Sequence, residues 1–188
     1  DVGKAKKGET FVVSAAGGAT GSVAGQIARI IGCKTIGIAG TQEKLDWIMS
    51  DLGFDHGINY KTENVEDQLR YFCPEGIDVY FDNVAGPILD AVLANIAVHG
   101  RVALSGMMEN YNKDEPVPGP YQFDMLLMRR ATITGFLSRD FFPRMKESDS
   151  QIRTWIDQDL ISLRFDETEG IENAPTAYTD LFEGKNIG

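Results

Sequence analysis

A short apolar run followed by a turn of small residues is the feature that most constrains this fold. Phe11 to Val13 form the run, and residues 14–22 then read Ser-Ala-Ala-Gly-Gly-Ala-Thr-Gly-Ser. The run is as short and β-rich as a strand that is covered on both faces of a parallel sheet. Gly18 and Gly21 would let the backbone turn tightly, and the first N–H groups of the next helix would point at a bound phosphate. The segment therefore predicts a strand–turn–helix unit for a dinucleotide pyrophosphate.

The turn departs from the usual Gly-x-Gly-x-x-Gly fingerprint in one position. Ala16 occupies the place of the first glycine. Any connection between a strand and a helix can use glycine, so a tight turn without a ligand remains an alternative. The helix that follows carries four large apolar residues at helical spacing, which predicts a face packed on the sheet: Val23, Ile27, Ile30 and Ile31.

Composition limits the partners of this chain of 188 residues. It has 28 acidic and 18 basic residues and a net charge of −10, so nucleic acids and anionic membranes would be repelled. Its hydrophobic fraction of 43% is ordinary for a globular protein. No apolar run approaches the roughly 18 residues that a membrane helix needs. We therefore expect neither nucleic acid nor a membrane as a partner.

The few cysteines and histidines argue against a metal centre. Cys33, Cys73, His56 and His99 are the only ones, and no two of them lie at a zinc-ligand spacing. Two lone cysteines fit a reducing cytoplasm, with both thiols serving as packing residues. The sequence therefore predicts a cytoplasmic protein without a metal site.

Strand-like and helix-like segments alternate along most of the chain. Strands are expected at residues 10–13, 34–40, 56–60, 77–82, 101–106 and 132–136, and helices at residues 41–50, 65–72 and 87–96. From Asp140 onward the chain is expected to be helical, with Ile152, Trp155, Ile156 and Leu160 on one face and a second helix over residues 173–182. This alternation predicts an α/β fold, a doubly wound six-stranded parallel sheet with helices on both faces. Ligands in such sheets bind beyond the carboxyl ends of the strands. The long loop over residues 107–121 falls on that side and is expected to be functional.

The end of the second strand indicates which dinucleotide binds. A NAD-binding domain places an acid there to bind the ribose hydroxyls, but this strand ends in Ala39 and Gly40. Glu43 lies past the turn, with Lys44 beside it. A 2′-phosphate needs a cation and is repelled by a close carboxylate. This pattern favours NADP(H) over NAD(H), although Lys44 as a solvated surface lysine is the alternative.

Nine short segments, by their order and spacing, resemble one branch of a known family. The branch is the prostaglandin reductase and alkenal double-bond reductase group of zinc-independent medium-chain dehydrogenases/reductases. The segments cover residues 15–23, 40–44, 52–55, 59–61, 80–84, 109–112, 135–137, 170–175 and 184–188. The resemblance implies a Rossmann domain for NADP(H) over residues 1–188. The family's N-terminal catalytic domain is absent, so we expect an isolated cofactor-binding fragment that is inactive by itself.

The resemblance also assigns roles to individual residues. The pyrophosphate turn matches Gly18, Ala19, Thr20 and Gly21, and the 2′-phosphate contacts match Lys44 and Tyr60. The nicotinamide end matches Asn83, Asn186 and the backbone of Phe136 and Leu137. Tyr111 matches the residue that donates a proton or stabilises an enolate, and it is the one expected catalytic side chain.

Simpler structural roles remain open for three of these residues. Tyr60 could be an ordinary aromatic at a strand end, Asn83 a turn residue and Tyr111 an exposed loop residue. Asp82, next to Asn83, is expected to make turn hydrogen bonds rather than act as a base.

The implied reaction is reduction of the C=C bond of an α,β-unsaturated aldehyde or ketone. The nicotinamide would deliver hydride to the β-carbon, and the α-carbon would take a proton. The family also suggests a homodimer through the region of the sixth strand. Three alternatives remain: a zinc-free quinone reductase domain, a non-catalytic nucleotide-sensing or subunit-interface module, and a methyltransferase. The methyltransferase would need the acid that is missing after the second strand.

Overall fold

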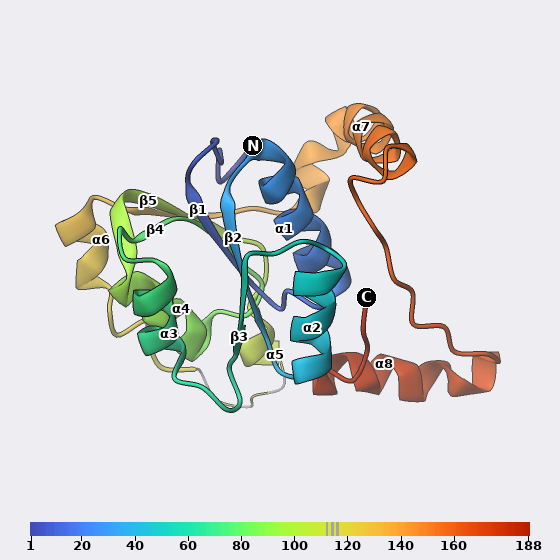
Figure 1. The fold of residues 1–188 in the computed structure, drawn as a ribbon. Helices are drawn as coiled ribbons and strands as arrows, with labels where there is room; N and C mark the ends of the chain where they lie inside the picture. Colours follow the sequence, from blue (N-terminus) through green and yellow to red (C-terminus); the bar gives the residue numbers. More distant parts are fainter. Residues whose placement is uncertain (112, 114, 116) are drawn as a thin grey trace.

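The computed structural model describes residues 1–111, 113, 115 and 117–188 of the chain. Its centre is one parallel sheet with the strand order β3-β2-β1-β4-β5-β6 (Figure 1). The strands are β1 (Thr10–Ser14), β2 (Lys34–Ala39), β3 (His56–Asn59), β4 (Ile77–Asp82), β5 (Ile96–Leu104) and β6 (Thr132–Gly135). The predicted six-stranded parallel sheet is confirmed, and its strand order reverses between β1 and β4.

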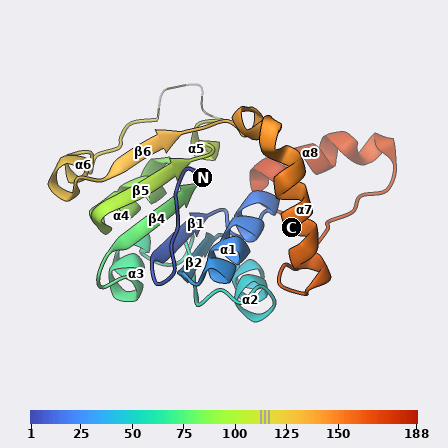
Figure 2. The ribbon, with the colours of Figure 1, turned by 90° about the horizontal axis from the view of Figure 1, so that it is seen from above.

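Helices cover both faces of the sheet, as expected for a doubly wound fold. The main ones are α1 (Ala19–Ile31), α2 (Gln42–Ser50), α3 (Val65–Phe72), α4 (Gly86–Ala94) and α6 (Asp124–Arg129). Helices α1 and α2 pack on one face, and α3, α4 and α6 pack on the other (Figure 2). Two hydrophobic cores result, one on each side of the sheet.

Side-chain alternation along the strands fills these two cores. Val12 and Tyr80 point into the core under α3 and α4 and are fully buried. Their strand neighbours Phe11, Val13 and Val79 point into the core under α1 and α2. Since β1 and β4 are apolar on both faces, they can only lie in the interior of a covered sheet.

The predicted apolar face of α1 is wrong. The face that is buried consists of four small residues and one glutamine, namely Gly21, Ser22, Gly25, Ala28 and Gln26. A Cβ atom at Gly25 would collide with the ring of Phe54, so the close approach of the helix requires glycine there. The large apolar residues Val23, Ile27, Ile30 and Ile31 are only half-buried or exposed. Close packing through small residues therefore replaces packing through large ones.

Other boundaries differ modestly from the expected ones. Helix α4 ends at Ala94, and β5 begins at Ile96 rather than at Arg101. The early part of β5 is irregular, with φ of +63° at His99. Within the expected long loop, Met108–Tyr111 forms the short helix α5, while residues 112, 114 and 116 lie outside the described part of the chain.

The part of the chain that follows β6 lies outside the sheet. It contains η1 (Ser138–Arg144), α7 (Met145–Asp157), η2 (Ile171–Asn173) and α8 (Ala174–Glu183). Gln26 of α1 exchanges two hydrogen bonds with the backbone of Ser162, at 3.0 and 2.7 Å. Helix α8 extends away from the sheet and its C-terminal end approaches α2 (Figure 1). Within the described residues, no helix is both long and apolar enough to cross a bilayer.

Candidate nucleotide-binding site

The turn between β1 and α1 places an uncapped helix N-terminus at the carboxyl edge of the sheet. Ala15 has φ of +50°, and its carbonyl accepts a 3.0 Å hydrogen bond from the N–H of Gly18. No side chain caps α1 at Gly18, and no acidic residue lies in its first turn. Ala19 and Thr20 are exposed. The positive end of the helix dipole is thus open to an anion.

Gly21 is required by the geometry of this turn. A Cβ atom at Gly21 would collide with the carbonyl oxygen of Ala15, whereas one at Gly18 would lie 3.4 Å from it, an ordinary contact. The predicted residues Gly18, Ala19, Thr20 and Gly21 therefore lie together around the start of α1.

Lys44 lies next to this turn and is engaged at both ends of its side chain. A Cβ atom at Gly17 would lie 2.9 Å from three carbons of the Lys44 stem, so glycine makes room for the lysine. The Lys44 Nζ donates a 2.6 Å hydrogen bond to the carbonyl of Gly184, at the C-terminal end of α8. Burial, and secondly the charge of Lys61, lower the pKa of Lys44, while Glu43 acts in the opposite direction. The Lys44 ammonium is half-buried and lies at the carboxyl edge of the sheet, as predicted.

The N-cap of α2 fixes the direction of Lys44. Thr41 is the N-cap residue, and its Oγ1 accepts a 3.3 Å hydrogen bond from the Lys44 N–H. Because the cap sets the start of α2, Lys44 lies in its first turn, one turn beyond the end of β2.

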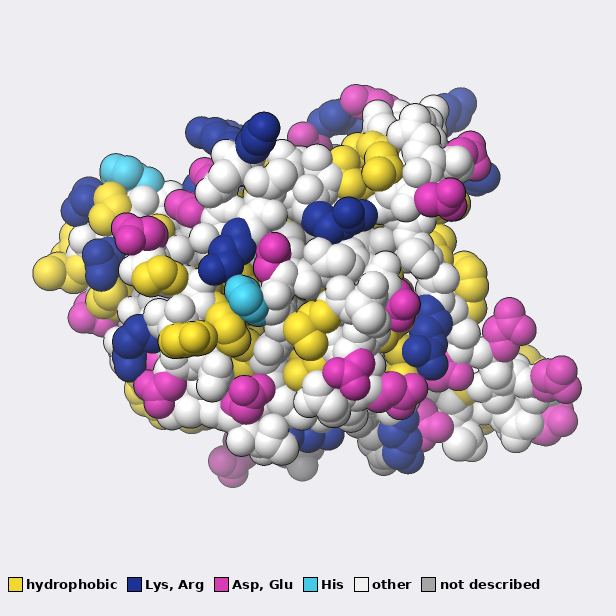
Figure 3. Space-filling model, viewed as in Figure 1, with side chains coloured by type: hydrophobic (Ala, Val, Ile, Leu, Met, Phe, Trp, Pro, Cys, Tyr) yellow, Lys and Arg dark blue, Asp and Glu magenta, His cyan; other side chains and the backbone are white. Residues whose placement is uncertain are grey.

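Tyr60 and Lys61 lie at the same corner. The Tyr60 side chain packs on Gly40, where a Cβ atom would lie 2.9 Å from both the ring carbon Cε1 and the hydroxyl oxygen of Tyr60. The Lys61 Nζ is 5.9 Å from the centre of the Tyr60 ring, within the range of a cation–π contact. On the face seen in Figure 3, Lys and Arg side chains reach the lower edge, where the strands end in Figure 1. The structure thus brings the predicted residues Lys44 and Tyr60 to one corner of the sheet. Lys61, which was not predicted as a site residue, lies there too.

Asp82 organises the turn after β4, at the point where the strand order reverses. Its Oδ1 accepts hydrogen bonds from Tyr80 Oη, Ser14 Oγ and the N–H groups of Val84 and Ala85, at 2.8–3.2 Å. The other carboxylate oxygen is buried without a partner among the described residues. Burial raises the pKa of Asp82, although these four hydrogen bonds act to lower it. Asp82 makes turn hydrogen bonds, as predicted.

Asn83 is held tightly to the end of β1. Its Nδ2 donates a 2.8 Å hydrogen bond to the Ser14 carbonyl, and its N–H donates to Ser14 Oγ at 2.9 Å. Asn83 is 8% exposed. The geometry gives Asn83 a role in joining two strand ends, and a contact with nicotinamide stays a prediction.

Tyr111 stands on the short helix α5 rather than on an irregular loop. Its Oη accepts a 3.3 Å hydrogen bond from the Met107 N–H, and its side chain is 58% exposed. Glu109 and Met108 donate their N–H groups to the Val84 and Asn83 carbonyls. The loop with Tyr111 is therefore anchored to the turn that carries Asn83.

Phe136 and Leu137 follow β6, and both of their N–H groups are engaged. The N–H of Phe136 donates to the Leu104 carbonyl at 3.3 Å. The N–H of Leu137 donates to Asp140 Oδ2 at 3.2 Å, and its carbonyl accepts from the Asp140 N–H at 3.0 Å. A carboxamide that binds Leu137 through the backbone would have to compete with Asp140.

The C-terminal tail, residues 184–188, lies against the pyrophosphate turn. The N–H of Gly188 donates to the Gly17 carbonyl at 3.1 Å, and Ile187 packs on the core under α1 and α2. Asn186 Nδ2 donates to the Gly188 carbonyl at 3.1 Å. The tail therefore places Asn186 near Gly17 and Lys44, and its contact with nicotinamide stays a prediction.

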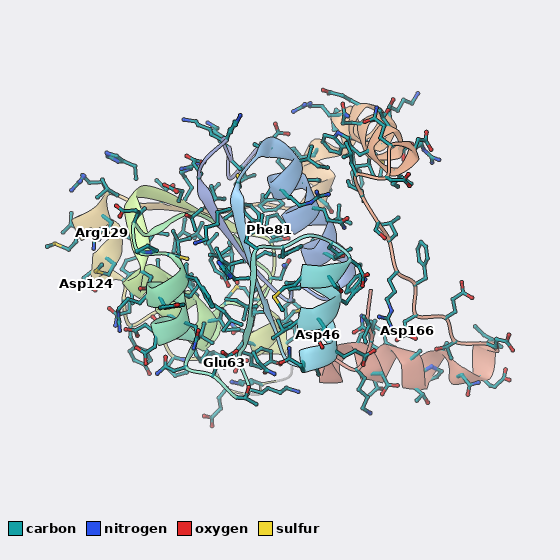
Figure 4. All side chains as sticks on the ribbon, viewed as in Figure 1. Asp46, Glu63, Phe81, Asp124, Arg129 and Asp166 are labelled. Atoms are coloured by element: carbon teal, nitrogen blue, oxygen red, sulfur yellow. The ribbon has the colours of Figure 1, made fainter. Side chains whose placement is uncertain are left out.

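An apolar cavity of about 310 Å³ lies between the N-terminal segment, α1 and the sheet. It is bounded by the N-terminal segment, by Ile27 and Ile31 of α1, and by the rings of Phe81 and Phe136. The Phe81 and Phe136 rings meet edge to face at 6.0 Å, and Figure 4 labels Phe81 within the sheet. The apolar lining of this cavity does not suit a charged dinucleotide.

The comparisons with known proteins agree with this geometry. A family model described as zinc-binding dehydrogenase matches residues 19–153. The chain belongs to this family. Despite the family's description, the part of the chain that the structure describes contains no cluster of three His, Cys, Asp or Glu residues able to hold a metal ion.

Several relatives within this dehydrogenase family are NADP(H)-dependent by name. The chain is 41% identical to the putative NADP-dependent oxidoreductase YfmJ of Bacillus subtilis, covering 100% of this chain and 56% of that protein. It is 41% identical to the 2-alkenal reductase (NADP(+)-dependent) of Nicotiana tabacum, covering 97% and 53%. The crystal structure of CurA from Vibrio vulnificus in complex with NADPH matches with a TM-score of 0.94 at 39% identity, covering 100% and 57%. The chain thus spans little more than half the length of these proteins.

Sequence reasoning missed three contributors to the site. Lys61 follows Tyr60 directly, and two cations near one strand end were a signal available in the sequence. Ser14 joins β1 to Asp82 and Asn83, but a serine at a strand end has no special signature. The Gly184 carbonyl is a backbone group 140 residues from Lys44, and no sequence pattern predicts its contact.

Proposed function

We propose that this chain binds NADPH along the carboxyl ends of β1, β2 and β4. The observation that carries this proposal is the corner at Gly40, where Lys44, Tyr60 and Lys61 meet and no acid ends β2. A 2′-phosphate suits two cations there, whereas the ribose hydroxyls of NADH would lack their usual carboxylate. The names of the relatives, and the complex of CurA with NADPH, support the same cofactor.

The turn at the start of α1 fits the pyrophosphate of the cofactor. Gly21 allows close approach of the backbone, and the first N–H groups of α1 are not capped by a side chain. A phosphate there would be stabilised by hydrogen bonds and by the helix dipole together. The nicotinamide would then extend toward Asn83 and Tyr111, beyond the ends of β4 and β5.

We further propose that the whole protein reduces the C=C bond of α,β-unsaturated aldehydes or ketones. When bound, NADPH would supply a hydride for the β-carbon of the substrate. Tyr111 would hold the substrate oxygen through its Oη and stabilise the negative charge that develops there, or donate the phenolic proton. The anchoring of α5 to Asn83 and Val84 would keep this hydroxyl in place.

We also propose a second domain, a dimer and a cellular compartment for the whole protein. A separate catalytic domain would form the second wall of the substrate cleft, in keeping with the greater length of the relatives. Two copies would pair through β6, which ends the sheet and is largely exposed. A reducing cytoplasm would suit Cys33 and Cys73, which are both buried and free, and burial raises the pKa of Cys73 to about 11.

A spectrophotometric assay of the protein in its natural length tests the proposed reaction. We expect consumption of NADPH with a 2-alkenal and recovery of the saturated aldehyde, whereas a simple saturated aldehyde gives no turnover. A quinone that is reduced while 2-alkenals and enones are not would contradict the proposed substrate class. Light scattering tests the dimer separately, because a monomeric mass would reject the pairing through β6.

A further inference from the structure

Lys44 and Lys61, the two lysines at the Gly40 corner, differ in how many of their N–H donors are engaged. The Nζ of Lys44 is half-buried and donates to the Gly184 carbonyl at 2.6 Å. Lys61 is exposed, and its Nζ lies 5.9 Å from the centre of the Tyr60 ring. Among the described residues, no hydrogen-bond acceptor is found for the Lys61 Nζ. Since a lysine ammonium carries three donors, Lys61 has the greater free capacity for a ligand.

The backbone around Lys61 is well fixed even though its side chain is exposed. The Tyr60 N–H donates to the Ala39 carbonyl, and the Lys61 N–H donates to Asn59 Oδ1, each at 3.1 Å. The N–H groups of Thr62 and Glu63 both donate to the Asn59 carbonyl. These hydrogen bonds hold the backbone of Lys61 in place beside the Tyr60 ring. Ligand binding would therefore cost little conformational entropy in the backbone.

The carboxylates nearest in sequence are directed to other partners. Glu43, beside Lys44, forms an ion pair of 3.5 Å with Arg164. Glu63 accepts the Asn59 N–H through Oε2 at 2.6 Å, and Figure 4 labels it on the loop after β3. Lys61 and Lys44 repel each other, which contributes to the lowered pKa of Lys44. An anion between the two ammonium groups would relieve this repulsion.

We propose that Lys61 is a specificity-determining residue for the 2′-phosphate of NADPH. Lys44 would also bind this phosphate, but one of its three N–H donors is already used by the Gly184 carbonyl. This inference rests on the proposed function. A phosphate monoester carries nearly two negative charges near neutral pH and accepts several charge-assisted hydrogen bonds. The 2′-hydroxyl of NADH offers no such charge, so Lys61 would distinguish the two cofactors.

Calorimetric titration of the chain with NADPH and with NADH, at one low salt concentration, tests the role of Lys61. Lys61→Met keeps an apolar stem against Tyr60 and removes the charge. We expect it to weaken NADPH binding about tenfold or more and to change NADH binding by less than about twofold. Lys61→Arg should retain most of the NADPH affinity. Lys146→Met, on the exposed face of α7, is the matched control for a lost surface charge.

The outcomes separate the inference from the proposed function. An unchanged NADPH affinity in Lys61→Met, in a chain that itself prefers NADPH, overturns the role of Lys61 and leaves the proposed cofactor standing. Equal weakening of both cofactors would mean that Lys61 supports only the local structure, and also overturns the inference. A native chain that binds NADH as tightly as NADPH instead overturns the proposed function.

Discussion

The Lys44 ammonium donates a 2.6 Å hydrogen bond to the Gly184 carbonyl and so joins the first turn of α2 to the C-terminal end of α8. The same lysine packs its stem on Gly17, whose carbonyl accepts the N–H of Gly188. One side chain therefore links the predicted 2′-phosphate corner, the pyrophosphate turn and the C-terminal tail. Cofactor binding and the order of the tail should depend on each other through Lys44.

Loss of the Lys44 ammonium should loosen the tail. In Lys44→Met, the Gly184 carbonyl loses a charged partner, so the amides of residues 185–188 should exchange with solvent about tenfold faster. Hydrogen-exchange mass spectrometry measures this directly, with Lys146→Met as the control. Unchanged exchange in the tail would show that the hydrogen bond between Lys44 and Gly184 does not hold it.

Gly21 should tolerate no side chain. In Gly21→Ala, the new methyl group would collide with the Ala15 carbonyl, so we expect a loss of about 1–3 kcal/mol in the free energy of unfolding. Gly18→Ala is the matched control in the same turn. Its methyl group would lie 3.4 Å from that carbonyl, and we expect a cost below about 1 kcal/mol. Equal denaturant midpoints for the two variants would refute the steric argument.

Asp82 should be replaceable by asparagine but not by alanine. Asn keeps an oxygen that accepts from Tyr80, Ser14 and the two N–H groups, so Asp82→Asn should cost less than about 1.5 kcal/mol. Asp82→Ala leaves these donors unpaired and should cost more than about 3 kcal/mol. Urea unfolding of both variants checks this, and an equal cost would contradict it.

The pH dependence of stability provides a second test of Asp82. Burial raises its folded pKa above the ordinary value of 3.8, so the folded chain binds this proton more tightly than the unfolded chain. The resulting stability is present below the unfolded pKa and is lost as pH rises through the folded pKa. The stability of the native chain relative to Asp82→Asn should therefore fall as pH increases from about 4. A relative stability that rises over this range would contradict the raised pKa.

Tyr111 should matter for turnover rather than for cofactor binding. In the protein of natural length, Tyr111→Phe removes the Oη that would stabilise or protonate the substrate, and kcat should fall about a hundredfold. The NADPH affinity should change by less than about twofold, because the charged phosphates provide most of the binding. Tyr71→Phe, at an exposed tyrosine on α3, is the control. Unchanged kcat would remove Tyr111 from the mechanism.

Local pattern sufficed for much of the fold. The bounds of α3 and β4 match the predicted residues because their apolar positions follow helical and strand spacing without interruption. The face of α1 could not be predicted, since its fit depends on Gly25 lying under Phe54 from a distant loop. The predicted start of β5 was wrong because the irregular backbone at His99 interrupts the alternation of apolar residues along the strand.

The candidate site divides in a similar way. The glycine turn and Lys44 follow from residue type and position along the chain, because helix N-termini and strand ends have known chemistry. The free capacity of Lys61 and the engagement of Leu137 by Asp140 depend on side-chain directions that no spacing encodes.

The most direct test of the central claim is the ratio of the dissociation constants of this chain for NADH and NADPH, measured by calorimetry under identical conditions. A corner with Lys44 and Lys61 and no acid at the end of β2 predicts that NADPH binds at least about tenfold more tightly. Equal affinities, or tighter binding of NADH, would contradict it.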